Sequence, residues 1–152
     1  MGFHRFLKYW LPVILVMLFI FYMSTGTFSS TNTALIIEPL LRFLVPSISE
    51  QTVNLIHRII RKCGHLAEYF FLGTLLFRAF RGGSRESRVW QWILGSGVVV
   101  VLYAISDEYH QSFEITRTAS PIDVAIDTVG GMVAQIVCAV LHYRGLKQGV
   151  PD

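Results

Sequence analysis

The sequence predicts an all-α, polytopic membrane protein with four transmembrane helices and both termini in the cytoplasm. Hydrophobic residues make up 53% of the 152 residues and charged residues only 15%, whereas a soluble domain has about 25% charged residues. The mean hydropathy is +0.51, and the apolar residues gather at 6–23, 64–80, 89–105 and 122–143. Because only helices and closed barrels satisfy their backbone in lipid, and the alternation of barrel strands is missing, we expect four helices in a single domain, 1–152.

The first apolar stretch, 6–23, is long enough to span a bilayer if Lys8 extends its charge towards the headgroups. Its basic start also resembles a signal peptide. No convincing small-x-small cleavage site follows Met23, so we expect this helix to be retained.

The segment 25–62 is too apolar for a free outer loop. In TALIIEPLLRFLVP, Glu38 and Arg42 are four residues apart and share one helical face. Ser49 is placed to cap a second helix, whose apolar stripe begins at Val53 and ends at Ile60. We therefore expect two amphipathic helices on the outer interface or folded over the bundle, before the second span begins at 64.

The loops between the spans predict their orientation. The loop after the second stretch contains four arginines, whereas the loop after the third contains only Arg117. Basic residues of short loops stay in the cytoplasm, so the Arg-rich loop predicts cytoplasmic termini. Three basic residues before the second stretch argue against this orientation, namely Arg58, Arg61 and Lys62.

Charge and cysteine usage argue against two functional classes. The net charge of +3 comes from scattered bases, which is not typical of nucleic-acid binding. Cys63 and Cys138 have no metal-ligand spacing and fall near opposite faces of the predicted bundle. They are interpreted as free thiols, although the sequence leaves a disulfide open.

The predicted topology brings three polar clusters to the outer side of the membrane. Their members are Lys62, His65, Glu68 and Tyr69; Ser106, Asp107, Glu108, His110 and Gln111; and Arg117, Ser120, Asp123 and Asp127. Within each cluster, residues three or four apart share a helical face. An acid inside a span is costly in lipid and faces the bundle interior by default, so Glu68 and Asp127 indicate a functional site.

The clusters suggest acid–base chemistry beside an anion-binding group. The catalytic candidates are Glu108, Asp127, Asp107, His110, His65 and Glu68. The substrate-binding candidates are Lys62, Arg117, Gln111, Tyr69 and Asp123. Neighbouring carboxylates in an apolar site can divide the roles of acid and base, and cationic side chains can hold a phosphate or carboxylate. No HExxH or cysteine-based spacing is present, so a divalent metal has weak support and no metal ligand is assigned.

Most of these residues also have a structural interpretation. Asp123 follows Ser120 at a helix start and fits a helix cap. His65 fits a hydrogen bond to Glu68, and Tyr69 fits the aromatic belt of the membrane interface. The remaining alternatives are an ion pair of Arg117 with Glu114 and a helix-packing face of Gly130, Gly131 and Ala134.

These motifs resemble the VanZ-like family of bacterial membrane proteins. The resemblance rests, in order, on Lys62-x-x-His65-x-x-Glu68-Tyr69, Asp107-Glu108-x-His110-Gln111-x-Phe113, Arg117, and Asp123-x-x-x-Asp127-x-x-Gly130. It covers about half of the chain, and the first span with Ser24 is also similar. It implies a multi-pass protein of the bacterial cytoplasmic (inner) membrane, linked to cell-envelope lipids or glycans. The family is named for a protein associated with low-level teicoplanin resistance.

Three functions fit these observations better than a fourth, a proton or ion transporter, because acids on one side only leave no relay across the membrane. The first is an outward-facing polar site that binds an amphiphilic envelope lipid or glycan-linked substrate and modifies it chemically. The second is a non-catalytic lipid- or lipoglycopeptide-binding protein that confers low-level glycopeptide resistance. The third is a structural accessory protein that acts through a protein partner, with the charges forming a satisfied network. Membrane lipids are expected partners in all three, and nucleic acid in none.

Overall fold

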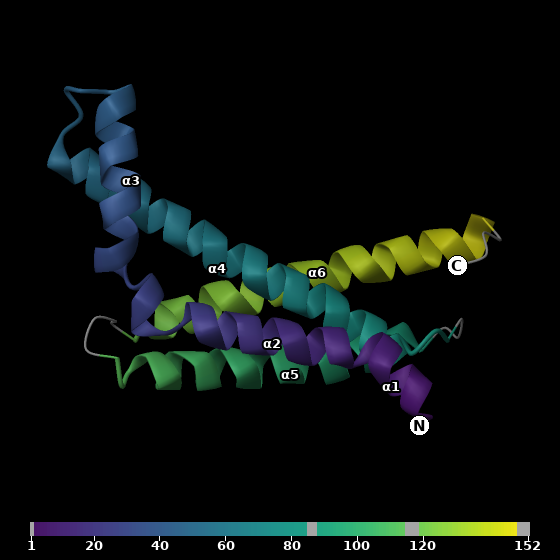
Figure 1. Cartoon of the computed structure of the whole chain (residues 1–152). Coiled ribbons are helices and arrows are strands. Elements are labelled where there is room, and N and C mark those ends of the chain that lie inside the picture. Colours follow the sequence, from purple (N-terminus) through teal and green to yellow (C-terminus); the bar gives the residue numbers. More distant parts are fainter. Residues whose placement is uncertain (1, 85–87, 115–118, 149–152) are drawn as a thin grey trace.

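The computed structural model describes residues 2–84, 88–114 and 119–148, and every regular element in these ranges is a helix. The helices are α1 (Phe3–Tyr9), α2 (Leu11–Met23), η1 (Gly26–Phe28), α3 (Ser30–Leu44), α4 (Glu50–Arg81), α5 (Val89–Gln111) and α6 (Pro121–Gln148). In Figure 1, α4 and α6 cross, α2 and α5 run beside them, and α3 stands away from the bundle. The all-helical fold class is therefore confirmed.

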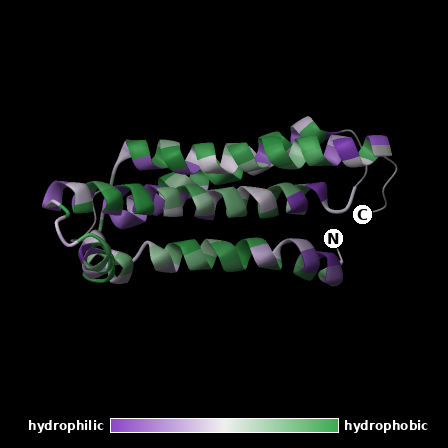
Figure 2. Ribbon diagram, turned by 90° about the horizontal axis from the view of Figure 1, so that it is seen from above, coloured by the Kyte–Doolittle hydropathy of each residue, from purple (hydrophilic) through white to green (hydrophobic). Residues whose placement is uncertain are grey.

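The first predicted span is bent. Helices α1 and α2 meet at an angle of 42° around Trp10. Pro12 lies at the start of α2, where it cannot donate a backbone hydrogen bond to the preceding turn. The Arg5 guanidinium donates to the Gly82 carbonyl at 2.6 Å and ties α1 to the end of α4. Figures 1 and 2 both place the first residues of α1 and the last of α6 at the same end of the bundle.

The amphipathic helix of the 25–62 segment forms as expected. Ser29 caps α3, and Arg42 donates to Glu38 at 2.9 Å. Ser49 caps the next helix, accepting a hydrogen bond from the Thr52 amide. The prediction is wrong in one respect: the helix that begins at Glu50 does not end before the second span. It continues as α4 through 32 residues to Arg81, because no residue between 50 and 81 breaks its backbone hydrogen bonds.

The apolar surface is compatible with a membrane protein. Large side chains that face outwards include Leu18, Leu102 and Ile136, each about 60% exposed. Figure 2 shows hydrophobic residues along the middle of the long helices and hydrophilic ones mostly near their ends. Among the described residues, α5 and α6 are long and apolar enough to cross a bilayer, and the bent pair α1–α2 is a third candidate. Four spans are therefore not confirmed. The span-like half of α4 contains His65, Glu68 and Arg78, which lower its apolar content.

Small residues hold the bundle together. A Cβ on Gly130 of α6 would lie 2.6 Å from the Leu66 carbonyl oxygen of α4. A Cβ on Gly131 would lie 2.5 Å from a methyl group of Val100 on α5. Such approaches require glycine, so the predicted packing role of Gly130 and Gly131 is confirmed. Along the crossing, the core contains the fully buried Leu72 and Leu76.

Candidate functional site

Helix α4 places a stripe of polar residues on one face. His57, Arg61, His65 and Glu68 follow one another at spacings of four, four and three residues. Such residues lie above one another on an α-helix. Because α4 is continuous, the basic residues before the second span and the polar residues inside it form a single surface.

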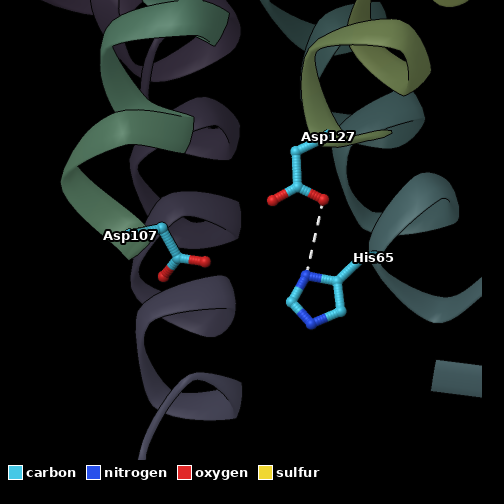
Figure 3. A group of neighbouring side chains, drawn as sticks. All are labelled: His65, Asp107 and Asp127. Carbon is cyan, nitrogen blue, oxygen red and sulfur yellow. Dashed lines mark ion pairs between the residues drawn. The ribbon is translucent and has the colours of Figure 1, made fainter. Parts of the chain in front are cut away.

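Three helices bring His65, Asp107 and Asp127 together. One nitrogen or oxygen atom of each lies within 4.8 Å of the other two. His65 Nδ1 lies 3.4 Å from Asp127 Oδ1. Figure 3 shows Asp127 from α6 and His65 from α4 in contact, with the Asp107 carboxylate of α5 directed towards them. Three catalytic candidates of the sequence therefore form one cluster, which we name the triad.

Asp107 is held by its neighbours. Its Oδ1 accepts a hydrogen bond from the Ser24 hydroxyl at 2.5 Å, and its Oδ2 accepts one from Gln111 Nε2 at 3.1 Å. All three side chains are buried. Gln111 thus positions an acid of the triad, and Ser24 contributes from the end of α2.

Asp127 is buried without such support. It is 0% exposed, and neither carboxylate oxygen has a hydrogen-bond partner among the described residues. His65 Nδ1 is also without one, because the 3.4 Å contact does not meet hydrogen-bond geometry. The triad therefore contains polar atoms whose partners the described protein does not supply.

Tyr69 lies in the core rather than in an aromatic belt. It is 0% exposed and packs beside Tyr103, with 6.2 Å between ring centroids. Its hydroxyl has no hydrogen-bond partner within the described part of the chain. The interfacial interpretation of Tyr69 is therefore wrong, since its neighbours are the helices of the bundle.

Glu108 and Asp123 support the start of α6 in different ways. Glu108 Oε2 accepts a hydrogen bond from the Ser120 backbone N–H at 2.7 Å. Ser120 itself accepts from the Ile122 amide at 3.2 Å. The Asp123 carboxylate instead pairs with Lys62 Nζ at 2.7 Å. Glu108 and Ser120 thus satisfy amides at this helix start, while Asp123 joins α6 to α4.

His110, Glu68 and Arg117 complete the set of predicted site residues. The His110 ring stacks on Phe21 of α2, with 4.3 Å between centroids, and does not belong to the triad. Glu68 is half-buried on the wall of a small cavity. Arg117 lies outside the described residues.

Two cavities border the triad. The larger, of about 210 Å³, is lined by Ser30, His57, Arg58, Arg61, Lys62, His65, Asp123 and Ile126. We name it the basic cavity. The smaller, of about 120 Å³, is lined by Met23, Ser24, Phe28, Thr33, Arg61, Gly64, His65 and Glu68. Arg61 and His65 line both, so these two residues connect the cavities.

The basic residues of α4 change the electrostatics of this region. Burial lowers the pKa of the Arg61 guanidinium, while the nearby carboxylates of Asp123 and Glu108 act in the opposite direction. Burial lowers the pKa of the His57 imidazole, and the Arg61 charge lowers it further. His57 Nε2 lies 2.8 Å from the Thr33 hydroxyl of α3. A neutral His57 and a partly buried cation at Arg61 thus lie side by side.

Arg61, His57 and the Ser24–Asp107 contact were not predicted as parts of the site. Arg61 and His57 could have been found from the regular spacing of polar residues from His57 to Glu68. This spacing is evident only if α4 is treated as one helix. Ser24 and Asp107 are 83 residues apart, and no local pattern connects them.

The two cysteines are free, as expected, with Cys63 exposed and Cys138 half-buried. Neither belongs to the triad.

These features define a class of protein: a small helical bundle, compatible with a membrane, with a buried histidine–carboxylate site near one end. The family model described as VanZ/LLP1 matches residues 9–142 of the chain. The chain therefore belongs to the VanZ/LLP1 family, and the resemblance seen in its motifs is confirmed. No curated protein and no solved structure matches it.

Proposed function

We propose that this protein spans the bacterial cytoplasmic membrane four times and binds the anionic headgroup of an amphiphilic envelope lipid on its outer side. The span added to the three candidates is the second half of α4, which is the second span along the chain. This half packs against α2, α5 and α6, so that its polar residues face the bundle while its remaining surface faces lipid.

The observation that carries the proposal is the position of Arg61. This arginine lines both cavities, together with Arg58 and Lys62 in the larger one and with His65 of the triad in each. Lys62 is already paired with Asp123, whereas no ion pair of Arg61 is found among the described residues. A partly buried guanidinium is well suited to bind a phosphate or carboxylate in two parallel hydrogen bonds.

Helix α3 supports an amphiphilic ligand over a soluble anion. Its Leu35, Ile36 and Phe43 are 72–81% exposed, and Ser30 at its start lines the basic cavity. An exposed apolar face beside a charged cavity matches a molecule with a charged head and an acyl tail.

The test compares two lipids that differ only in headgroup. The full chain is reconstituted with phosphatidylglycerol or with phosphatidylcholine of the same acyl chains, in the presence of EDTA, and binding is followed by native mass spectrometry. We expect a preference for phosphatidylglycerol, which Arg61→Gln reduces by about tenfold, because hydrogen bonds to charged groups contribute about 1.5–3 kcal/mol. Arg144→Gln is the control, since Arg144 is exposed on α6 and lines neither cavity. Equal binding of the two lipids, or an unchanged Arg61→Gln, would contradict the proposal.

The proposed function is binding alone, and a lipoglycopeptide of the teicoplanin type is a second candidate ligand. The complete burial of Asp127 favours binding without chemistry, since a ligand in the basic cavity meets His65 and Asp123 but not this carboxylate. The second candidate function is binding followed by chemical modification of the lipid, and mass spectrometry of lipid recovered after incubation separates the two. Unchanged lipid supports pure binding, and a product with wild-type protein that is lost in Asp127→Asn supports proton transfer by the triad.

A further inference from the structure

The strongest unexplained feature of the molecule is the set of unpartnered atoms in the triad. Asp127 presents two buried oxygens and His65 one buried nitrogen, and none of the three has a hydrogen-bond partner among the described residues. A buried carboxylate without hydrogen-bond partners is unfavourable, and the 3.4 Å contact between Asp127 and His65 is the only ion pair of the triad among the described residues. A group from outside the chain would satisfy these atoms.

We propose that the triad binds one divalent cation of the zinc type through His65, Asp107 and Asp127. The three potential ligand atoms lie within 4.8 Å of one another, and the side chains converge from three helices in Figure 3. Three ligands at zinc distances of about 2.1 Å in a tetrahedral arrangement are about 3.4 Å apart. His65 and Asp127 already have this separation, and the wider separations, of up to 4.8 Å, need to close by up to about 1.4 Å.

The charges of the cluster match a divalent cation. Two carboxylates lie close together in a buried place, and the one imidazole beside them is neutral when it acts as a ligand. A dication balances two negative charges. The Asp107 carboxylate is oriented by Ser24 and Gln111, which is the arrangement of outer hydrogen bonds that metal ligands usually have.

The donor set selects among cations. One imidazole nitrogen with two carboxylate oxygens suits zinc or manganese, whereas calcium prefers six to eight oxygen ligands. Three protein ligands leave a coordination position open in a zinc site. His65 lines both cavities, so an ion bound by this residue would lie close to them.

The metal site is separate from the proposed headgroup binding, and it is tested without lipid ligands. The full chain, freed of any affinity tag and stripped with EDTA, is titrated with Zn²⁺ by calorimetry, and bound metal is measured by elemental mass spectrometry. We expect one zinc per chain and a melting temperature that rises with zinc and returns with EDTA. Loss of an outer hydrogen bond to a ligand already weakens metal binding by about 10–100-fold, so Asp127→Asn and His65→Gln are expected to weaken it at least as much.

Glu108→Gln is the matched control. Glu108 is a buried acid next to Asp107 in the sequence but outside the triad, and a glutamine can still accept the Ser120 hydrogen bond. It should bind zinc like the wild type. Absence of zinc from the wild-type chain, or full binding by Asp127→Asn, overturns the proposal. If Asp127→Asn fails to fold, the absorption spectrum of Co²⁺-loaded His65→Gln and wild-type protein decides instead. A chain that takes up no zinc in the titration but still prefers phosphatidylglycerol in EDTA would refute the metal site alone.

Discussion

The Nδ1 atom of His65 and the Oδ1 atom of Asp127 lie 3.4 Å apart, next to a close approach of the helices that carry them. One residue after His65, the Leu66 carbonyl oxygen would be 2.6 Å from a Cβ on Gly130, which follows Asp127 by three residues. The glycine lets the two backbones meet, and this contact brings the histidine and the carboxylate together. Helix packing and site geometry thus have the same origin.

Gly130→Ala should therefore destabilise the bundle and open the triad. Because the new methyl group meets the Leu66 backbone, which cannot move freely, we expect a loss of about 1–3 kcal/mol in the free energy of unfolding. The melting temperature in detergent measures it. Gly145→Ala on the same helix is the control, since nothing lies within 4 Å of a Cβ there. Its higher helix propensity should stabilise the helix by up to about 1 kcal/mol. Equal effects of the two substitutions would argue against the packing role of Gly130.

Ser24→Ala tests the support of Asp107. The substitution removes the donor to Asp107 Oδ1 and leaves a buried carboxylate oxygen without its partner. We expect the free energy of unfolding to fall by about 1–3 kcal/mol. Thermal unfolding in EDTA measures this change. Ser112→Ala should change stability little, because the Ser112 hydroxyl is exposed and donates only to the Tyr109 carbonyl of its own turn. An unchanged melting temperature for Ser24→Ala would mean that Asp107 is held by Gln111 alone.

In contrast to Ser24→Ala, the substitution Asp127→Asn should not destabilise the protein when metal is absent. No described hydrogen bond depends on the Asp127 carboxylate, and the neutral amide removes one of two buried negative charges. In EDTA, the melting temperature should therefore stay the same or rise, as is common where a functional site is strained. A drop of several degrees would instead show that the triad is a structural network whose members depend on one another.

The long helices could be predicted from the sequence, but not all of their ends. The apolar stretch 89–105 stops at the first polar residues, whereas α5 continues to Gln111. Its last turns remain helical because Asp107, Glu108 and Gln111 are buried inside the bundle. In the same way, the charges at 58–62 suggested the border of a membrane span, yet they lie within α4. Hydropathy predicts which part of a helix is surrounded by lipid, but it does not predict where the helix begins or ends.

Part of the site could be predicted, because the spacing of residues within a helix can be taken from the sequence, whereas the rotation of the helix cannot. The spacing of polar residues within each of three helices identified His65, Asp107 and Asp127. Ionisable side chains within apolar helices face the interior of the bundle. The rotation of each helix about its axis decides which of two adjacent acids enters the triad. Asp107 does so, while Glu108 turns to the Ser120 amide. That rotation depends on contacts between distant residues, such as Gly131 with Val100.

The pH dependence of stability should reveal the pair of His57 and Arg61. Burial and the neighbouring guanidinium lower the pKa of His57 below the 6.5 of a free histidine. Between the lowered value and 6.5, the unfolded chain binds a proton that the folded chain does not, so stability rises with pH across this window. The contribution of His57 is complete above about pH 6.5 and is lost as the pH falls through the folded pKa.

His57→Gln isolates this effect from the other titrating groups. Glutamine can keep a hydrogen bond to Thr33 but takes up no proton. Melting temperatures of both proteins in EDTA are compared at about pH 5 and about pH 8. The wild type should lose more stability than the variant on going to the lower pH, because its unfolded chain takes up a proton at His57 more readily than its folded chain does, whereas glutamine takes up none. Parallel curves for the two proteins would place the pH sensitivity elsewhere, and a steeper curve for the variant would contradict the lowered pKa.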